Sequence, residues 1–359
     1  MPTKPRARDL GIPFDGAPGP FNAITDVTGL ELGLSTLVSG SDCRTGVTIL
    51  HPRGRAHSEP VMAGFFSLNG NGEMTGMHWV EEGGWLEGPI GITNTHSVGV
   101  VRDAIIHWQA EHGMLYQPWS CPIVAETADI WLNDMNGFFV KPEHVWSALD
   151  NAASGPVAEG NVGGGTGMIC YQFKGGTGTS SRKLTDEEGG WTVGVLVQAN
   201  FGRRPQLQIA GVPVGKVIAE DMPGVSGEDA PTTENGSIII VVATDAPLLP
   251  HQLKRLARRA TLGLARTGSM AGNSSGDIFL AFSTGNRPPA HGEQTSSLAA
   301  VANDHMDPLF FATAQATEEA IVNALVAAET MRGRDGRAVY ALPHERLRAV
   351  MQSYNRLTE

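Results

Sequence analysis

The stretch NGSIIIVVATDAP, residues 235–247, decides the fold of this chain. Its centre, Ile238 to Val242, is a run of five β-branched residues, and such a run favours a β-strand. A strand with one solvent-exposed face would alternate apolar and polar residues, so an unbroken apolar run is typical of a strand buried on both faces. The sequence therefore predicts a central strand with another layer on each side, in a layered α/β or α+β sandwich.

An acidic, turn-rich segment leads directly into this strand. Residues 219–236, AEDMPGVSGEDAPTTENG, contain few large apolar groups and predict an exposed loop. The bond between Gly236 and Ser237 therefore lies where a surface loop meets the core. On composition alone this junction is an ordinary turn entering a strand. The alternative is chemical: the Ser237 hydroxyl attacks the Gly236 carbonyl, and glycine helps because it has no Cβ to obstruct the attack.

Cleavage at this bond would produce a nucleophile and a base together. The ester formed on Ser237 would hydrolyse, and Ser237 would become the first residue of a new chain. Its α-amine, with an ordinary pKa of about 7.7–8.0, would then lie beside its own hydroxyl. Ser275 and Asp277 are two residues apart and point to the same side of an extended chain. They form either a proton relay next to Ser237 or a local turn capped by Asp277.

Other segments supply the remaining layers. Besides the run at 237–243, strands are predicted at residues 45–50, 191–199 and 277–282, which are rich in β-branched or aromatic residues. Apolar residues at helical spacing predict helices around residues 101–108, 142–152 and 253–264. A last helix is expected near residues 317–331, with Thr317 as its N-cap.

Composition and charge exclude several classes of protein. The chain has 359 residues and a formal net charge of −11, which disfavours a nucleic-acid-binding surface. Membrane-spanning proteins are excluded because no apolar stretch approaches the roughly 20 residues that span a bilayer. The three cysteines are widely spaced and fit reduced thiols, and no apolar leader follows the N-terminal basic residues, so a cytoplasmic location is expected.

No metal or cofactor is expected from the sequence. The glycine-rich runs GNVGGGTGM and KGGTGTSSR do not match the phosphate-binding loops of nucleotide-binding proteins. His107 and His112 are five residues apart, whereas the paired ligands of a zinc helix are four apart.

Several ordered blocks of sequence resemble one enzyme family. They are ITNTHSVG at 92–99, PIVAETAD at 122–129, GNVGGGTGMICYQFKGGTGTSSR at 160–182, VQANFG at 197–202, ENGS at 234–237, NSSGDIFLAFSTGN at 273–286 and GRDGRAVYALPHERL at 333–347. The family is the DmpA and BapA group of L-aminopeptidase/D-esterase and β-aminopeptidase enzymes, in the P1 peptidase group. The resemblance runs from about residue 10 to residue 350.

This resemblance implies a four-layer αββα sandwich similar to the N-terminal nucleophile hydrolases. It implies one catalytic domain that cleaves itself at Gly236–Ser237 into an α chain, residues 1–236, and a β chain, residues 237–359. Ser237 matches the family's nucleophile, and Ser275 and Asp277 match its second serine and acidic partner, which in β-aminopeptidases can be glutamate. Asn200 matches the amide that helps to form the oxyanion hole.

The resemblance also assigns substrate contacts. Glu126 matches the acidic residue that holds the free amino group of the substrate, whereas without the family it would be a surface carboxylate. Ala128 departs from the family, in which an aromatic residue, often tyrosine, is expected at this position. Relatives form homotetramers of processed αβ heterodimers, so the same assembly is expected here.

The leading hypothesis is therefore a self-processing serine aminopeptidase. It would remove N-terminal residues from small peptides, amides or esters through an acyl-enzyme on Ser237, without a cofactor. An acyltransferase like the ornithine acetyltransferases is the alternative, although those enzymes use threonine as the nucleophile. A non-catalytic binding module that never cleaves itself is the third possibility. The sequence leaves open the preference for L-, D- or β-amino acids and the identity of the general base.

Overall fold

The apolar run at 238–242 lies in β11 (Ser237–Thr244), and its side chains alternate between two cores. The computed structural model describes residues 4–224, 236–288 and 294–358. Ile238, Ile240 and Val242 belong to one apolar cluster, while Ile239 and Val241 belong to another. The prediction of a strand buried on both faces is thus confirmed. Of the predicted loop at 219–236, residues 225–235 lie outside the described residues.

Two sheets lie face to face. The six-stranded sheet has the order β4 (Trp85–Leu86), β3 (Val61–Ser67), β12 (Asp277–Ser283), β11, β10 (Thr192–Asn200) and β9 (Gly176–Lys183). Only its β11–β12 pair is parallel. The four-stranded sheet has the order β1 (Glu31–Ser39), β2 (Cys43–His51), β5 (Ile90–Asn94) and β6 (Ile123–Thr127). Apolar residues of both sheets meet in one cluster between them, which includes Ile92, Ala125, Ile239 and Leu280.

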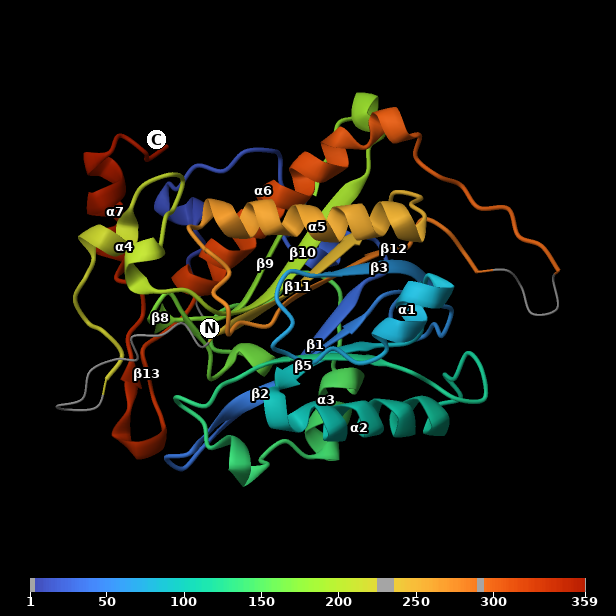
Figure 1. Ribbon diagram of the computed structural model, residues 1–359, viewed down its shortest axis with the longest axis horizontal. Coiled ribbons are helices and arrows are strands. Elements are labelled where there is room, and N and C mark those ends of the chain that lie inside the picture. Colours follow the sequence, from blue (N-terminus) through green and yellow to red (C-terminus); the bar gives the residue numbers. More distant parts are fainter. Residues whose placement is uncertain (1–3, 225–235, 289–293, 359) are drawn as a thin grey trace.

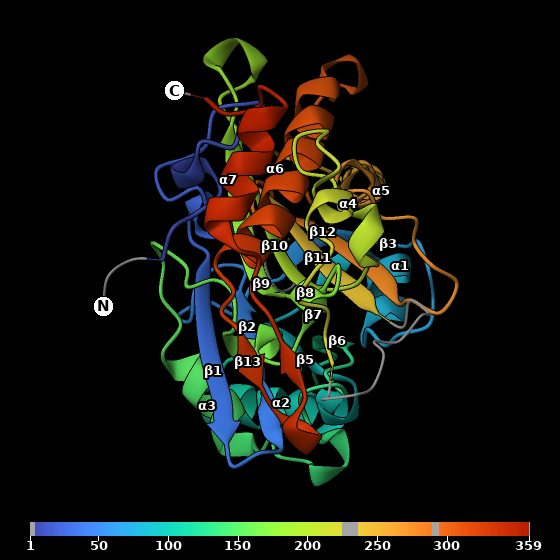
Figure 2. The same ribbon diagram turned by 90° about the vertical axis from the view of Figure 1, so that its left-hand side faces the viewer.

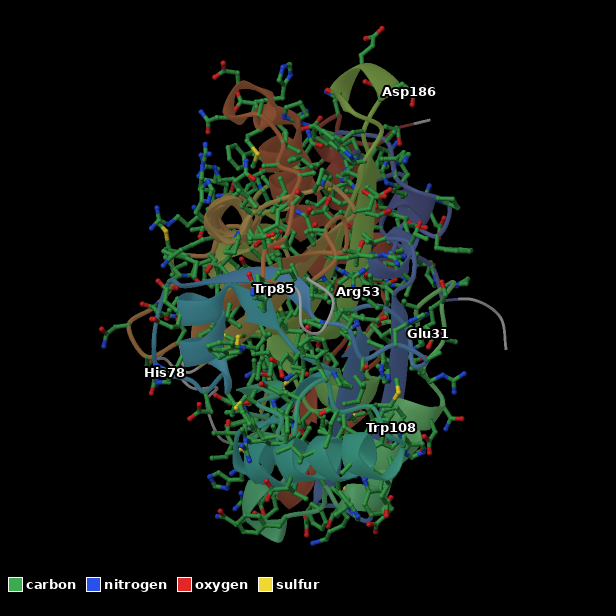
Figure 3. All side chains as sticks on the ribbon, turned by 90° about the vertical axis from the view of Figure 1, so that its right-hand side faces the viewer. Glu31, Arg53, His78, Trp85, Trp108 and Asp186 are labelled. Atoms are coloured by element: carbon green, nitrogen blue, oxygen red, sulfur yellow. The ribbon has the colours of Figure 1, made fainter. Side chains whose placement is uncertain are left out.

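Helices cover the outer face of each sheet, as Figures 1 and 2 show. On the six-stranded sheet lie α5 (Pro250–Arg266) and α6 (Asp307–Val326). On the four-stranded sheet lie α2 (Val98–Glu111) and α3 (Pro142–Asp150). Trp108 of α2, labelled in Figure 3, packs in the cluster between these helices and their sheet. The result is the expected four-layer αββα sandwich.

Short elements complete the chain. The helices are α1 (Met77–Gly83), α4 (Val214–Val217) and α7 (His344–Ser353). The strands form two small hairpins, β7 (Ile169–Cys170) with β8 (Phe173–Lys174), and β13 (Met331–Arg332) with β14 (Ala338–Val339). Within the described residues, no helix is both long and apolar enough to cross a membrane.

The prediction for the last helix was wrong in both position and cap. Helix α6 begins ten residues earlier than expected, at Asp307, and α7 follows it. Thr317 is buried inside α6, where its hydroxyl donates to the carbonyl of Thr313 at 2.8 Å. Pro308 at the first turn of α6 was the available start signal, because proline is favoured there.

Candidate active site

Ser237 is the first residue of β11 and lies between the ends of two neighbouring strands. On one side it pairs in register with Asn200, the last residue of β10. On the other side β12 begins at Asp277, which pairs with Ile238. The Ser237 hydroxyl oxygen accepts a hydrogen bond from the backbone N–H of Gly276 at 2.9 Å. The strand register therefore brings residues from three distant parts of the sequence around one buried hydroxyl.

Gly236 is closely confined by the end of β10. A Cβ built on it would lie 2.1 Å from the carbonyl oxygen of Asn200 and 2.7 Å from Cα of Phe201. Real Cβ atoms do not approach backbone atoms this closely, so a larger residue would displace the chain next to Ser237. Only glycine therefore fits at this junction without displacing the backbone.

Ser275 and Asp277 are buried and bonded to each other. The Ser275 hydroxyl lies 2.9 Å from Oδ2 of Asp277, and Oδ1 of the same carboxylate accepts from the backbone N–H of Ile238 at 3.2 Å. Asn69, which the sequence did not suggest, donates from Nδ2 to the Ser275 hydroxyl at 2.9 Å. Asp277 therefore links Ser275 to the backbone of the residue that follows Ser237.

The amide of Asn200 is held at both of its polar atoms. Its Oδ1 accepts from the backbone N–H of Ile169 at 2.9 Å. Its Nδ2 donates to the carbonyl of Ala128 at 3.0 Å. A side-chain amide carries two N–H groups, so one of them can serve this carbonyl while the other serves a different acceptor. The two contacts fix the orientation of the amide beside Ser237.

Glu126, at the end of β6, is buried with only 4% of its surface exposed. Its Oε1 accepts from the backbone N–H of Glu73 at 2.8 Å, and its Oε2 accepts from the hydroxyl of Thr95. Burial raises the pKa of this carboxyl above its ordinary value, although both hydrogen bonds oppose the shift. Glu126 is thus a desolvated acid, for which a cation would be a favourable partner.

Gly72 connects Glu126 to the Ser237 region. A Cβ built on Gly72 would lie 3.2 Å from Oε1 of Glu126 and 3.2 Å from Cα of Gly276. Gly276 is the residue whose N–H contacts the Ser237 hydroxyl. Glu126 and the Ser237 hydroxyl therefore both lie close to the neighbouring backbones of Gly72 and Gly276.

A cavity of about 330 Å³ opens beside the junction. Asn200 and Gly236 form part of its wall, and Ala128 lies where a larger side chain would reduce its volume. The other lining residues are mostly apolar or glycine, with two arginines: Ile130, Trp131, Gly167, Ile169, Gln172, Phe201, Gly202, Arg203, Pro223 and Arg337. A mostly apolar cavity with a few polar groups is typical of small-molecule sites.

The structure places Ser237 next to Asn200, Ser275 and Asp277, and it places Glu126 near them across Gly72 and Gly276. It adds three residues that sequence reasoning missed. Asn69, Glu73 and Thr95 support the predicted residues through hydrogen bonds. Only Thr95 had a signal, because it lies in the ITNTHSVG block. Among the described residues no group of three or more histidine, cysteine, aspartate or glutamate side chains could hold a metal ion.

Comparison with known proteins gives a consistent result. The model of the family described as Peptidase family S58 matches residues 22–339. The chain is 53% identical to the beta-peptidyl aminopeptidase BapA of Sphingosinicella microcystinivorans, over 98% of this chain and 93% of that protein. It is 50% identical to the BapA of Sphingosinicella xenopeptidilytica, over 97% of this chain and 91% of that protein.

A solved structure is similar over nearly the whole chain. It is the L-aminopeptidase D-Ala-esterase/amidase of Ochrobactrum anthropi, described as a variant of the Ntn hydrolase fold. The TM-score is 0.92 at 48% sequence identity, and the match covers 99% of this chain and 100% of that one. This chain therefore belongs to peptidase family S58, and it is a hydrolase of the aminopeptidase type.

Proposed function

We propose that this aminopeptidase matures by cleaving itself between Gly236 and Ser237 and then uses Ser237 as its N-terminal nucleophile. The observation that carries the proposal is the placement of Ser237, whose hydroxyl accepts from Gly276 N–H and which pairs across the strands with Asn200, directly after the closely confined Gly236. The mature enzyme would be one catalytic domain made of residues 1–236 and 237–359.

Maturation begins when Ser237 Oγ attacks the carbonyl carbon of Gly236. The C–N bond between the two residues breaks, the hydroxyl proton ends on the departing nitrogen, and an ester links Gly236 to the Ser237 side chain. Water then hydrolyses the ester. The products are a carboxylate on Gly236 and a free α-amine on Ser237, with an ordinary pKa of about 7.7–8.0.

Peptide hydrolysis repeats the same chemistry on a bound substrate. Glu126 holds the substrate ammonium group, and Ser237 attacks the carbonyl next to it. The Asn200 Nδ2 group donates to the developing oxyanion, a contact typically worth about 3–4 kcal/mol. The Ser237 α-amine, with Ser275 and Asp277, accepts the hydroxyl proton and passes it to the leaving amine. Water then releases the acyl group.

The substrates we propose are short peptides, amides and esters with a free amino group, including those that begin with a β-amino acid. Support comes from the relatives, because the two proteins at 53% and 50% identity are named beta-peptidyl aminopeptidases. Ala128 leaves room beside Asn200 in the cavity.

A substrate panel tests the activity. We expect the purified enzyme to release p-nitroaniline from β-homoalanyl and L-alanyl p-nitroanilides, and to leave the N-acetylated versions intact because they lack the ammonium group. The matched assay measures acetyl transfer from acetylornithine to glutamate. Transfer without any hydrolysis would contradict the peptidase proposal.

Assembly and location complete the proposal. We propose a homotetramer of processed αβ heterodimers, which light scattering coupled to gel filtration would measure. We propose a cytoplasmic location because the three cysteines are widely spaced in the sequence and fit reduced thiols.

Replacing Gly236 by alanine tests the role of space at the junction. We expect Gly236→Ala to slow self-cleavage about tenfold or more, because the new Cβ moves the scissile carbonyl away from Ser237. The rate is measured from a denaturing-gel time course of freshly purified protein. Gly99→Ala is the control, since a Cβ at Gly99 meets nothing within 4 Å. Equal rates for both variants would contradict this role.

A further inference from the structure

Lys174 is a fully buried cation that the proposed chemistry does not use. It is the last residue of β8, and its Nζ donates to the carbonyls of Met168 at 2.7 Å and Gly175 at 2.8 Å, with Gly165 at 3.4 Å. Burial lowers the pKa of the amine to about 7. The ammonium has three N–H groups and the neutral amine has two, so the two shorter contacts, to Met168 and Gly175, can be made in either state.

The Met168 carbonyl connects Lys174 to Asn200 in the active site. Met168 and Ile169 share one peptide group, whose C=O accepts from Lys174 and whose N–H donates to Oδ1 of Asn200. Because a peptide group is planar, fixing its oxygen also fixes the direction of its N–H. Lys174 therefore helps to fix the direction from which the Asn200 amide is held, together with the backbone N–H of Gly175, which donates to the same Met168 carbonyl at 2.9 Å.

A second buried titratable side chain, that of Asp129, lies next to the residue that makes the other contact of Asn200. Nδ2 donates to Ala128 O, and the next residue, Asp129, is buried and accepts from Asn133 Nδ2 at 3.0 Å. A Cβ on Gly167 would lie 2.8 Å from Cβ of Asp129, so the two segments that hold Asn200 pack against each other. Asp129 also attracts Lys174 electrostatically. Burial raises the pKa of Asp129 to about 7 and lowers that of Lys174 to about 7, and their attraction opposes both shifts. When both groups are ionised, this attraction favours the closed arrangement of the two segments.

A purely structural role would not need this connection. Desolvating an ammonium group costs several kcal/mol, and an apolar side chain of similar volume is often no worse for stability. Arg204 shows the structural use of a buried cation nearby, since it donates to the carbonyls of Tyr171 and Gln172 in the same hairpin. Lys174 differs because the peptide that it holds also contacts Asn200.

We propose that Lys174 is a positioning residue that acts through the Met168–Ile169 peptide to aim the Asn200 amide at the oxyanion. This inference rests on the proposed function of Asn200. Replacing Lys174 by methionine removes the donors while keeping a long side chain. We expect kcat to fall roughly 10- to 100-fold with KM changed less than about twofold, because a displacement of about 1 Å at the reacting atoms can cost about 100-fold.

A double-mutant cycle separates positioning from general destabilisation. We compare wild type, Lys174→Met, Asn200→Ala and the double variant, with kcat normalised to the amount of processed β chain. The expected result is that Lys174→Met has less than about a twofold effect on kcat once Asn200 is alanine. The same loss in both backgrounds, or no loss in the wild-type background, would overturn the inference.

Two further variants and one member of the cycle complete the test. Arg182→Met is the control, because it removes another buried cation, which donates to the carbonyls of Asp15, Ser181 and Gln315. This variant should keep kcat per processed chain within about twofold of wild type. A large kcat loss in that control would overturn the inference. Lys174→Gln keeps hydrogen-bond donors, and its kcat is expected to lie between those of wild type and Lys174→Met. If Lys174→Met does not fold, Lys174→Gln replaces it in the cycle. If Asn200→Ala alone leaves kcat intact, the proposed oxyanion role fails together with this inference, whereas additive losses overturn only the inference.

Discussion

Ser237→Ala is expected to remain one uncleaved chain of 359 residues and to hydrolyse no substrate. The substitution removes the oxygen that attacks Gly236, so the α-amine of residue 237 is never released. Both the nucleophile and the base are then missing, and kcat should fall by at least about 10⁴-fold, as when the nucleophile of a serine hydrolase is removed. A denaturing gel and a p-nitroanilide assay measure the two effects.

The control for this variant lies at the other end of the same strand. The Thr244 hydroxyl donates to the carbonyl of Thr192 at 2.8 Å and is buried like that of Ser237. Thr244→Ala should therefore lower stability and still give two processed fragments. Cleavage of Ser237→Ala at residue 236 would show that another group attacks the bond, and retained activity would show that another residue forms the acyl-enzyme.

Glu126→Gln is expected to lower kcat/KM about 10- to 100-fold for substrates with a free ammonium group. Glutamine keeps the shape and can still bond to Glu73 N–H and Thr95, but it lacks the charge. A hydrogen bond to a charged group is worth about 1.5–3 kcal/mol, and each 1.4 kcal/mol is about tenfold. A 3-hydroxyacyl p-nitroanilide, which lacks the amine, is the matched substrate and should lose less than about twofold. Equal losses on both substrates would contradict the ammonium-binding role.

Although Glu126→Gln should lower kcat/KM, it should raise the stability of the folded chain near neutral pH. Because burial raises the pKa of Glu126 above the unfolded value of 4.5, the folded chain binds a proton more tightly than the unfolded chain. Stability is therefore lost as pH rises from 4.5 through the folded pKa. In the uncleaved Ser237→Ala background, Glu126→Gln should raise the melting temperature at pH 8, with the gain disappearing at low pH. No pH dependence of this difference would mean that Glu126 is not a desolvated acid.

The central strand could be predicted because its signal is local. The run at 238–242 needs both faces covered, and the structure covers one face with α5 and α6 and the other with the second sheet. Strand β9 was missed because GTGTSSRK has the composition of a loop. Its glycines serve packing: a Cβ on Gly178 would lie 2.0 Å from the carbonyl of Ala320 in α6. That requirement depends on Ala320, which lies 142 residues after Gly178 in the sequence and therefore outside any local pattern.

The residues of the candidate site also divide into those that the sequence indicates and those that only tertiary packing reveals. Ser237, Ser275 and Asp277 were candidates because they lie at or just before strand starts, where an ordinary turn was the other interpretation. The resemblance to relatives favoured the chemical interpretation and added Asn200 and Glu126. Their supporting contacts come from segments that no local pattern connects, such as the Asn69 amide on Ser275 and the Lys174 ammonium behind Met168. Glu126 looks like a surface acid in the sequence, and only tertiary packing against Glu73 and Thr95 buries it.

N-terminal sequencing of the active, mature enzyme tests the central claim most directly. We predict two chains after purification, one of which begins Ser-Ile-Ile-Ile-Val-Val, with the activity proportional to the amount of that chain. Fully active material that contains only the intact chain, or a fragment that begins at any other residue, would contradict the account.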